Sequence, residues 1–202
     1  MDLLPSILFF LAVTLVTLQV ALAGDADILS DFIPPSNTTV PPDGSFFTYT
    51  GLRADTMPPD FKVFKASMAE FPALNGQSVS FAVLMYPPGT VNPPHTHPRA
   101  SELLFLLVGS LEVGFVTTTN DLFNQTLQEG DIFVFPKGLV HFQYNREEKA
   151  PAIAVSAFGS ASAGTVSIPI AVFNTSIYDP VLAASFKTDV VTIKRLKYGL
   201  SH

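Results

Sequence analysis

From residue 45 onward, short apolar runs alternate with turn-forming residues along the chain. The runs are rich in β-branched and aromatic residues, which is typical of β-strands. Gly109 and Ser110 lie between two strong runs and predict a two-residue hairpin turn, because Gly suits the first position of such a turn. Many short strands, Gly- and Pro-rich turns and no long helical period predict an all-β domain, either a sandwich, a barrel or a jelly roll. The runs predicted to be strands are 46–50, 79–85, 103–108, 111–117, 132–135, 140–144, 152–157 and 165–172.

The two ends of this β region have different patterns. Residues 25–44 contain two Pro-Pro pairs and an Asp-Gly pair, which predict an extended arm that wraps the domain. Near the other end, apolar residues recur at helical spacing through residues 181–196, and basic residues follow where they suit a helix C-terminus. This pattern predicts a broken pair of helices. Two roles remain open for them: an arm that packs against a neighbouring subunit, or a lid on their own barrel.

Residues 1–23 are predicted to be a signal peptide. The stretch is almost wholly apolar from residue 3, and it ends in Ala-Leu-Ala before Gly24, the small-x-small pattern of a signal peptidase site. A membrane anchor is the alternative, because the stretch is near spanning length and its start carries no Lys or Arg. The polar sequence after Gly24 favours cleavage. We therefore expect a secreted protein with no membrane association after the leader is removed.

Three Asn-x-Ser/Thr triplets support export and predict N-glycosylation at Asn37, Asn124 and Asn174. Ordinary polar loops produce the same triplets by chance, so each triplet alone is weak evidence for glycosylation.

The chain has 0 Cys, which excludes disulfides and thiolate metal sites. Hydrophobic residues make up 48% of the chain and charged residues 14%, as in a well-buried β protein. The formal net charge of −6 argues against a nucleic acid partner.

Three of the 4 His residues and one Glu have a spacing that indicates a metal site. His95 and His97 are two residues apart, so both imidazoles face the same side of a strand. Glu102 opens the apolar run 103–108, where a carboxylate is costly to bury without a cation. His141 lies on a later predicted strand that can return beside the first. A lone His is usually a surface or core residue, but that reading does not explain the whole set.

Three imidazoles and one carboxylate suit Mn, Fe, Zn, Ni or Cu, and argue against Ca or Mg. Four protein ligands leave two positions of an octahedron open for water or a substrate. A tetrahedral Zn ion would instead use all four ligands, and the site would then be structural. The residue types alone do not choose the metal.

Two ordered motifs carry a resemblance to a known family. Residues 89–109 read Gly-x5-His-x-His-x4-Glu-x6-Gly, and residues 130–145 read Gly-x5-Pro-x-Gly-x2-His-x3-Asn. Together they resemble the two cupin motifs in the form typical of plant germin-like proteins. The resemblance implies a cupin jelly-roll β-barrel with a C-terminal α-helical extension. The predicted mature domain, residues 24–202, then divides into an arm, a barrel and helices, which we place at 24–44, 45–177 and 178–202.

The resemblance also implies a cofactor, a location and an assembly. One Mn²⁺ ion per subunit is expected, with His95, His97, Glu102 and His141 as its ligands and Asn92 near the open metal positions. The protein is expected to be an apoplastic or cell-wall glycoprotein. It is expected to form a homo-oligomer, a hexamer built as a trimer of dimers, with the C-terminal helices at the subunit contacts.

Two departures from the family pattern affect these expectations. Most germins have an N-terminal Cys pair that fastens the arm, and this chain has none, so packing alone is expected to hold the arm. True germins also place an oxalate-binding Asn thirteen residues before the first His ligand, where this chain has Ala82. The missing amide argues against oxalate oxidase activity, because sites built on hydrogen bonds discriminate through them.

Three functions follow from the resemblance and from these departures. The preferred hypothesis is a redox enzyme that acts on superoxide or another small anion, with superoxide dismutation foremost. The second is a non-enzymatic, wall-associated binding or storage protein whose metal is structural. Oxalate oxidase activity ranks below both because of Ala82.

Overall fold

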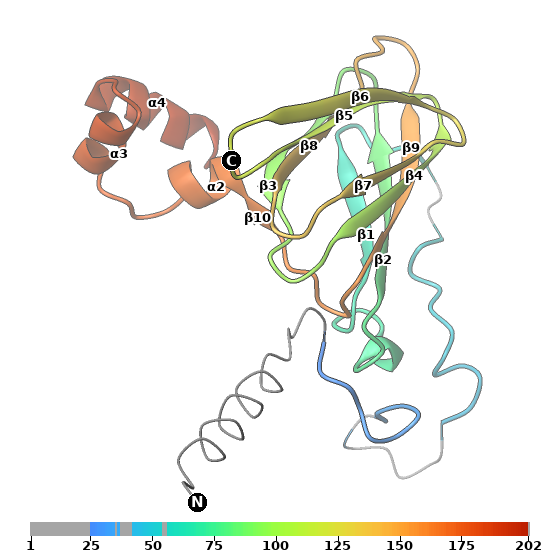
Figure 1. The fold of residues 1–202 in the computed structure, drawn as a ribbon. Coiled ribbons are helices and arrows are strands. Elements are labelled where there is room, and N and C mark those ends of the chain that lie inside the picture. Colours follow the sequence, from blue (N-terminus) through green and yellow to red (C-terminus); the bar gives the residue numbers. More distant parts are fainter. Residues whose placement is uncertain (1–24, 35, 37–41, 54–55, 202) are drawn as a thin grey trace, which may run out of the picture.

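The computed structural model describes residues 25–34, 36, 42–53 and 56–201. The predicted leader and the triplet at Asn37 lie outside these residues. Two antiparallel five-stranded sheets face each other, with short helices at the C-terminal end (Figure 1), so the all-β prediction is confirmed. One sheet, called here the β4 sheet, has the order β1 (Lys62–Ala66), β2 (Ser80–Tyr86), β9 (Ala152–Phe158), β4 (Glu102–Val108) and β7 (Ile132–Phe135). The other, the β8 sheet, has the order β10 (Val166–Ser167), β3 (Val91–Thr96), β8 (Val140–Tyr144), β5 (Ser110–Val116) and β6 (Leu122–Gln128).

The core lies between the two sheets and is built from alternate residues of their strands. In β4, Leu104 and Leu106 are 0% exposed, whereas Leu103 and Leu107 face away from the core and are 48% and 44% exposed. This alternation follows from the two-residue period of a strand. The side chains buried in the main core are Ala82, Leu84, Tyr86, Leu104, Leu106, Leu111, Val113, Leu127, Phe135, Ala152 and Ala154.

The hairpin predicted at Gly109-Ser110 is wrong. β4 ends at Val108 and β5 begins at Ser110, but the two strands belong to different sheets, so the chain crosses from one sheet to the other at Gly109. Gly109 has φ +85°, and an added Cβ would lie 2.5 Å from the carbonyl oxygen of Pro151. Only Gly allows this close crossing.

Two other strand predictions are also wrong. Residues 44–47 form turns, and Phe46 and Phe47 pack edge to face with ring centroids 4.9 Å apart instead of joining a sheet. Strand β10 covers only two residues of the run 165–172, and helix α2 (Ile168–Phe173) takes most of the rest. The other predicted strands are present. Strands β1, β3 and β6 and the 3₁₀ turn η1 (Pro72–Leu74) were not predicted from the apolar runs.

The helices at the C-terminal end form a small unit beside the barrel (Figure 1). Helices α3 (Asp179–Ser185) and α4 (Val190–Gly199) confirm the predicted helical pair. Their own core contains Leu182, Ala183 and Ile193, with Val172 and Phe173 of α2 packed against it. None of the three helices contributes a residue to the wall of the cavity described below, so the helices do not cover that cavity. No helix in the described part of the chain is long and apolar enough to cross a membrane.

The outer faces of the two sheets differ in polarity. Several outward-facing residues of the β4 sheet are large, apolar and exposed, including Phe81, Leu103, Leu107, Ile132 and Val134. The outer face of the β8 sheet carries Glu112, Asn124 and Thr126 on neighbouring strands. A contiguous exposed apolar surface, like the outer face of the β4 sheet, often marks a contact with another protein.

Candidate metal centre

The structure brings the four predicted ligand side chains together between the sheets. His95 lies on β3 and His97 directly after it, Glu102 begins β4, and His141 lies on β8 opposite His95. All four are buried, with exposures of 3%, 7%, 1% and 1%. One ligand atom from each lies within 4.8 Å of every other. A single ion can therefore contact all four side chains.

Strand β3 presents its His residues inward because its pairing changes within the strand. Asn92 is opposite Gln143 and His95 is opposite His141, so the register shifts between these pairs. The segment that spans the shift, Pro93-Pro94, cannot donate backbone hydrogen bonds and suits such an irregularity. The bulge places His95 and His97 on the same inward side.

Hydrogen bonds to the backbone fix the orientation of all three imidazoles. Each Nδ1 atom lies close to a carbonyl oxygen: that of Pro93 for His95 (2.8 Å), Gly164 for His97 (2.5 Å) and Leu139 for His141 (2.9 Å). A carbonyl oxygen only accepts, so each Nδ1 carries the proton and donates. In the neutral form of each ring, Nε2 then has a free lone pair, and this is the tautomer that a metal ligand requires.

The acceptor atoms of the cluster face one another at short distances. Glu102 Oε2 lies 3.1 Å from His141 Nε2 and 3.2 Å from His97 Nε2. Lone pairs that face each other in a buried site repel unless a cation lies between them, and Glu102 has no Lys or Arg partner among the described residues. Two ligands at right angles, each about 2.1–2.2 Å from one ion, are about 3.1 Å apart. The residues therefore fit a divalent metal with nitrogen and oxygen ligands.

The lowered pKa values of His95 and Glu102 favour the charge states that bind a cation, a neutral imidazole and an ionised carboxylate. Burial, and then the charge of His141, lowers the pKa of His95 from 6.5 to about 4, so its ring is neutral at pH 7. Burial alone would raise the pKa of Glu102. With protons on the Nε2 atoms of His141 and His97 in place of a metal ion, however, the hydrogen bonds and charges of these rings outweigh burial and lower the pKa of Glu102 from 4.5 to about 2. Glu102 is thus ionised over the physiological range. The site offers three imidazole nitrogens and one carboxylate.

Ser156 is a buried partner of the cluster that the sequence did not reveal. Its hydroxyl donates to Glu102 Oε1 at 2.6 Å, and its side chain is 0% exposed. This contact occupies one carboxylate oxygen and leaves Oε2 directed at the imidazoles. Ser156 lies on β9, which is paired with β4, so it holds the orientation of Glu102 across the sheet.

A turn after β9 supports His97 and is held from two sides. The carbonyl of Gly164 accepts from His97, and an added Cβ on Gly164 (φ +72°) would lie 2.8 Å from the guanidinium of Arg99. Arg99 Nε donates to the Ser162 carbonyl at 2.6 Å. From the N-terminal arm, the Asp25 carboxylate accepts from the Ser160 hydroxyl at 2.5 Å and the Ala161 amide at 2.6 Å. Specific hydrogen bonds therefore fasten the start of the arm, in addition to packing.

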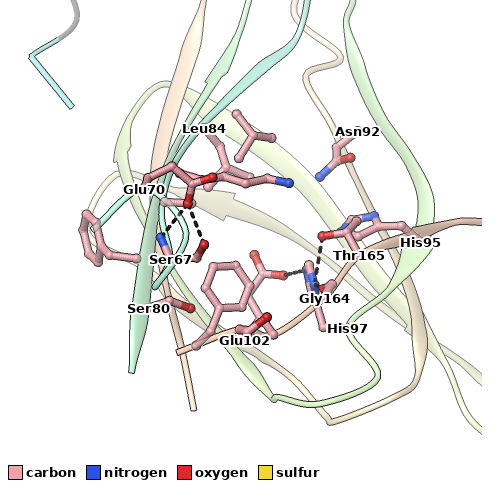
Figure 2. A pocket seen from close by; sticks show the side chains of 17 residues that line it. Ser67, Glu70, Ser80, Leu84, Asn92, His95, His97, Glu102, Gly164 and Thr165 are labelled. Atoms are coloured by element: carbon pink, nitrogen blue, oxygen red, sulfur yellow. Dashed lines mark hydrogen bonds and ion pairs between the residues drawn. The ribbon is translucent and has the colours of Figure 1, made fainter. Parts of the chain in front are cut away.

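A cavity of about 230 Å³ leads to the cluster (Figure 2). Its wall includes His95, His97 and Glu102, and also Asn92, which the sequence placed near the open metal positions. Ala82 lines the same cavity and presents only a methyl group. A small ligand can therefore approach the cluster from solvent, and the side chain at position 82 offers it no hydrogen bond.

Asn92 belongs to a second buried network that sequence reasoning missed. Its Nδ2 donates to Gln143 Oε1 at 2.6 Å, and the Tyr86 hydroxyl donates to the same oxygen at 3.3 Å. Gln143 is 0% exposed. Its position two residues after His141 is the signal that could have revealed it, because both side chains then face inward from β8.

The described glycosylation candidates are accessible. Asn124 lies on β6 and Asn174 follows α2, and both are exposed. Their neighbouring hydroxyl residues are also exposed, so the geometry permits modification. These two sites, like Asn37, stay predictions.

Comparison with known proteins defines the class first. The family described as Cupin matches residues 53–194, which span the barrel and most of the helical unit. A solved structure of oxalate oxidase in complex with the substrate analogue glycolate has a TM-score of 0.78 and 30% identity, and the match covers 88% of this chain and 98% of that one. Fold, cluster and motifs therefore define a cupin.

Relatives in sequence identify the group within the cupin family to which the chain belongs. Germin-like protein 9-3 of Oryza sativa subsp. japonica is 58% identical over 207 residues, covering 97% of this chain and 96% of the relative. Nectarin-1 of Nicotiana plumbaginifolia is 49% identical over 138 residues, covering 67% of this chain and 60% of the relative. The chain belongs to the germin-like proteins of the cupin family.

Proposed function

We propose that this protein is a secreted, manganese-binding germin-like protein whose metal centre acts on superoxide. The observation that carries the proposal is the group of three Nε2 lone pairs and one ionised carboxylate converging in a buried site that a cavity reaches. Nitrogen and oxygen ligands suit manganese, and the germin-like resemblance favours it over the other candidate metals. Manganese, when bound, supplies two accessible oxidation states.

Neighbouring residues hold the four ligand side chains in place. The Nδ1 hydrogen bonds prevent the imidazoles from turning away, and Ser156 does the same for Glu102. The rings of Phe158 and Phe135 pack on His97 and His141, with centroids 4.8 and 4.5 Å apart, and exclude water from that side. A small anion can then approach the cluster through the cavity beside Asn92.

The test begins with metal analysis of the purified protein. We expect about one manganese ion per chain and superoxide dismutation that disappears when a chelator removes the metal and returns when manganese is restored. A Glu102→Gln variant, which keeps the shape but removes the charge, is expected to bind little metal and to show no activity. Equal rates in the loaded and stripped proteins would end the proposal.

The second candidate is a non-enzymatic binding or storage protein with a structural metal. The burial of all four ligand side chains favours it, because structural sites are closed. The number of exchangeable waters on the bound ion separates the two functions. Two exchangeable waters, measured by water-proton relaxation, support catalysis, and none supports a structural ion.

Oxalate oxidation stays the third candidate, supported by the solved oxalate oxidases at 30% identity. Ala82 is 1% exposed and lines the cavity, where its methyl group gives a dianion no hydrogen bond. An Ala82→Asn variant is expected to increase oxalate turnover over the wild type. No increase would show that the missing amide is not the limiting feature.

A further inference from the structure

The wall of the cavity that leads to the cluster includes one lysine, and its ammonium forms no ion pair with Glu102. Lys65 lies on β1 next to Ala82 of β2, its partner in the strand register. Val63 and Lys65 both line the cavity, while Lys62 lies on the outer face with its ammonium 4.9 Å from the centre of the Phe64 ring. Among the described residues, none forms a hydrogen bond or ion pair with the Lys65 ammonium. This cation is therefore available to a ligand.

Glu70 lines the same cavity and is fixed in place by Ser67. Its Oε2 accepts from the Ser67 amide at 3.0 Å and from the Ser67 hydroxyl at 2.5 Å. The bond from the hydroxyl lowers the pKa of Glu70, and the charge of Lys65 lowers it further. Glu70 is thus an anion, but it forms no ion pair with Lys65 within 4.0 Å. Figure 2 shows Glu70 and Ser67 across the cavity from Asn92 and His95.

The charges around the cavity favour a ligand with one negative charge. Lys65 and Glu70 offset each other, and a divalent ion at the cluster exceeds the single charge of Glu102 by one. A monoanion neutralises this one excess positive charge. The second negative charge of a dianion is not neutralised, and Glu70 repels it. This net charge rests on the metal centre proposed above.

The walls of the cavity favour an organic ligand of limited size. Apolar side chains cover much of the surface, and they include Val63, Ala82, Leu84, Phe158 and Ala163. The volume of about 230 Å³ is smaller than the pockets of about 300 Å³ and above that take drug-sized ligands. A short hydrocarbon segment can pack here while a charged end reaches Lys65.

We propose that the cavity binds a small organic monocarboxylate, with the carboxylate at Lys65 and the apolar part against Val63, Ala82 and Leu84. The inference goes beyond the proposed function and rests on its metal centre: the cavity selects a singly charged organic acid over a dicarboxylate. Lys65 is then a specificity-determining residue, and the small side chain of Ala82 leaves room for the ligand beside it.

The test compares three probes with four carbons: butanoate, neutral butanamide and the dianion succinate. Dissociation constants are measured by titration calorimetry or ligand-detected NMR on the manganese-loaded wild type, Lys65→Gln and the control Lys62→Gln. A charge-assisted hydrogen bond is worth about 1.5–3 kcal/mol, so the wild type is expected to prefer butanoate by about 10-fold or more. Lys65→Gln loses this preference, and Lys62→Gln, with the same charge change on the other face of β1, keeps it.

The proposal fails if the wild type binds butanoate and butanamide equally, prefers succinate, or keeps its preference in Lys65→Gln. Metal content is measured in every sample, so failure of the metal proposal is recognised separately as a protein that takes up no ion. The comparison of butanoate with butanamide is repeated on the chelated protein. A Lys65-dependent preference there supports the carboxylate site by itself, and its absence in both forms overturns the site.

Discussion

At the scale of single residues, the metal centre depends on contacts outside the four ligands. Ser156 binds Glu102 Oε1, and backbone carbonyls bind each imidazole Nδ1. Spacing in the sequence could predict His95, His97 and His141, because a two-residue period and two recognisable motifs place them. It could not predict Ser156, since one Ser in an apolar strand has no pattern that distinguishes it.

Replacing Ser156 with Ala is expected to weaken metal affinity by about 10- to 100-fold, the usual effect of losing a partner that orients a ligand. The carboxylate of Glu102 becomes free to rotate, while the barrel is unchanged. Competition with a chelator measures the affinity, and the unfolding temperature of the metal-free protein checks the fold. Ser185→Ala, in helix α3, is the control, and equal affinities in the two variants would contradict the role assigned to Ser156.

The metal-free protein is expected to lose stability as the pH falls from 6.5 to 4. Burial lowers the folded-state pKa of His95 to about 4, so the unfolded chain takes up this proton at a higher pH than the folded chain. The contribution is present above the unfolded value and is lost as the pH falls. The lowered pKa of Glu102 extends the loss below pH 4.5. Thermal unfolding followed by circular dichroism across this range tests the sign, and a His95→Gln variant should show a weaker dependence between pH 6.5 and 4.

At the scale of elements, the sequence predicted buried strands better than exposed or irregular ones. Strand β6 was missed because only Leu127 of its residues is buried, so no apolar run marks it. Strand β3 contains Pro93-Pro94, whose low strand propensity hides a segment held by its neighbours β8 and β10. The β-branched residues of the run 165–172 predict a strand, but Pro169 suits the first turn of α2, which the structure contains there.

The helical unit is expected to unfold locally without affecting the metal centre. Ile193 is 0% exposed in the small core of α3 and α4, and removing its side chain should cost about 2–5 kcal/mol there. In an Ile193→Ala variant, hydrogen exchange should speed up in α3 and α4 but not in β3 and β8. Val191→Ala, at a position that is 59% exposed, is the control. Faster exchange throughout the barrel would show that the two units are not independent.

At the scale of the whole molecule, the apolar outer face of the β4 sheet supports the proposal that the protein assembles with copies of itself. Leu103 and Ile132 are exposed on this face, whereas the β8 sheet has a mixed outer face. The helical unit beside the barrel also exposes apolar residues, including Val181 and Phe186. These two surfaces suit the hexamer expected from the germin-like resemblance, in which the helices lie at subunit contacts.

A charge introduced on the β4 sheet is expected to dissociate this assembly. Leu103→Arg places a guanidinium on the proposed contact, and a buried unpaired charge is strongly unfavourable. Light scattering coupled to size exclusion should show a smaller mass for this variant. Leu122→Arg, at a leucine on β6 that is 55% exposed against 48% for Leu103, should keep the wild-type mass. Identical masses for both variants and the wild type would place the contact elsewhere or show that the protein is a monomer.

The contact of Asp25 with the turn at residues 160–161 matters for the choice of where a recombinant chain begins. Protein that starts at residue 28 keeps all the strands and helices of the part that the structure describes, but the Ser160 hydroxyl and the Ala161 amide lose their carboxylate acceptor. The same turn leads to Gly164, whose carbonyl holds His97. We expect such shortened protein to release its ion to a chelator sooner than protein that starts at residue 24. Preparations that differ by a few residues at this end should therefore be compared for metal content before they are compared for activity.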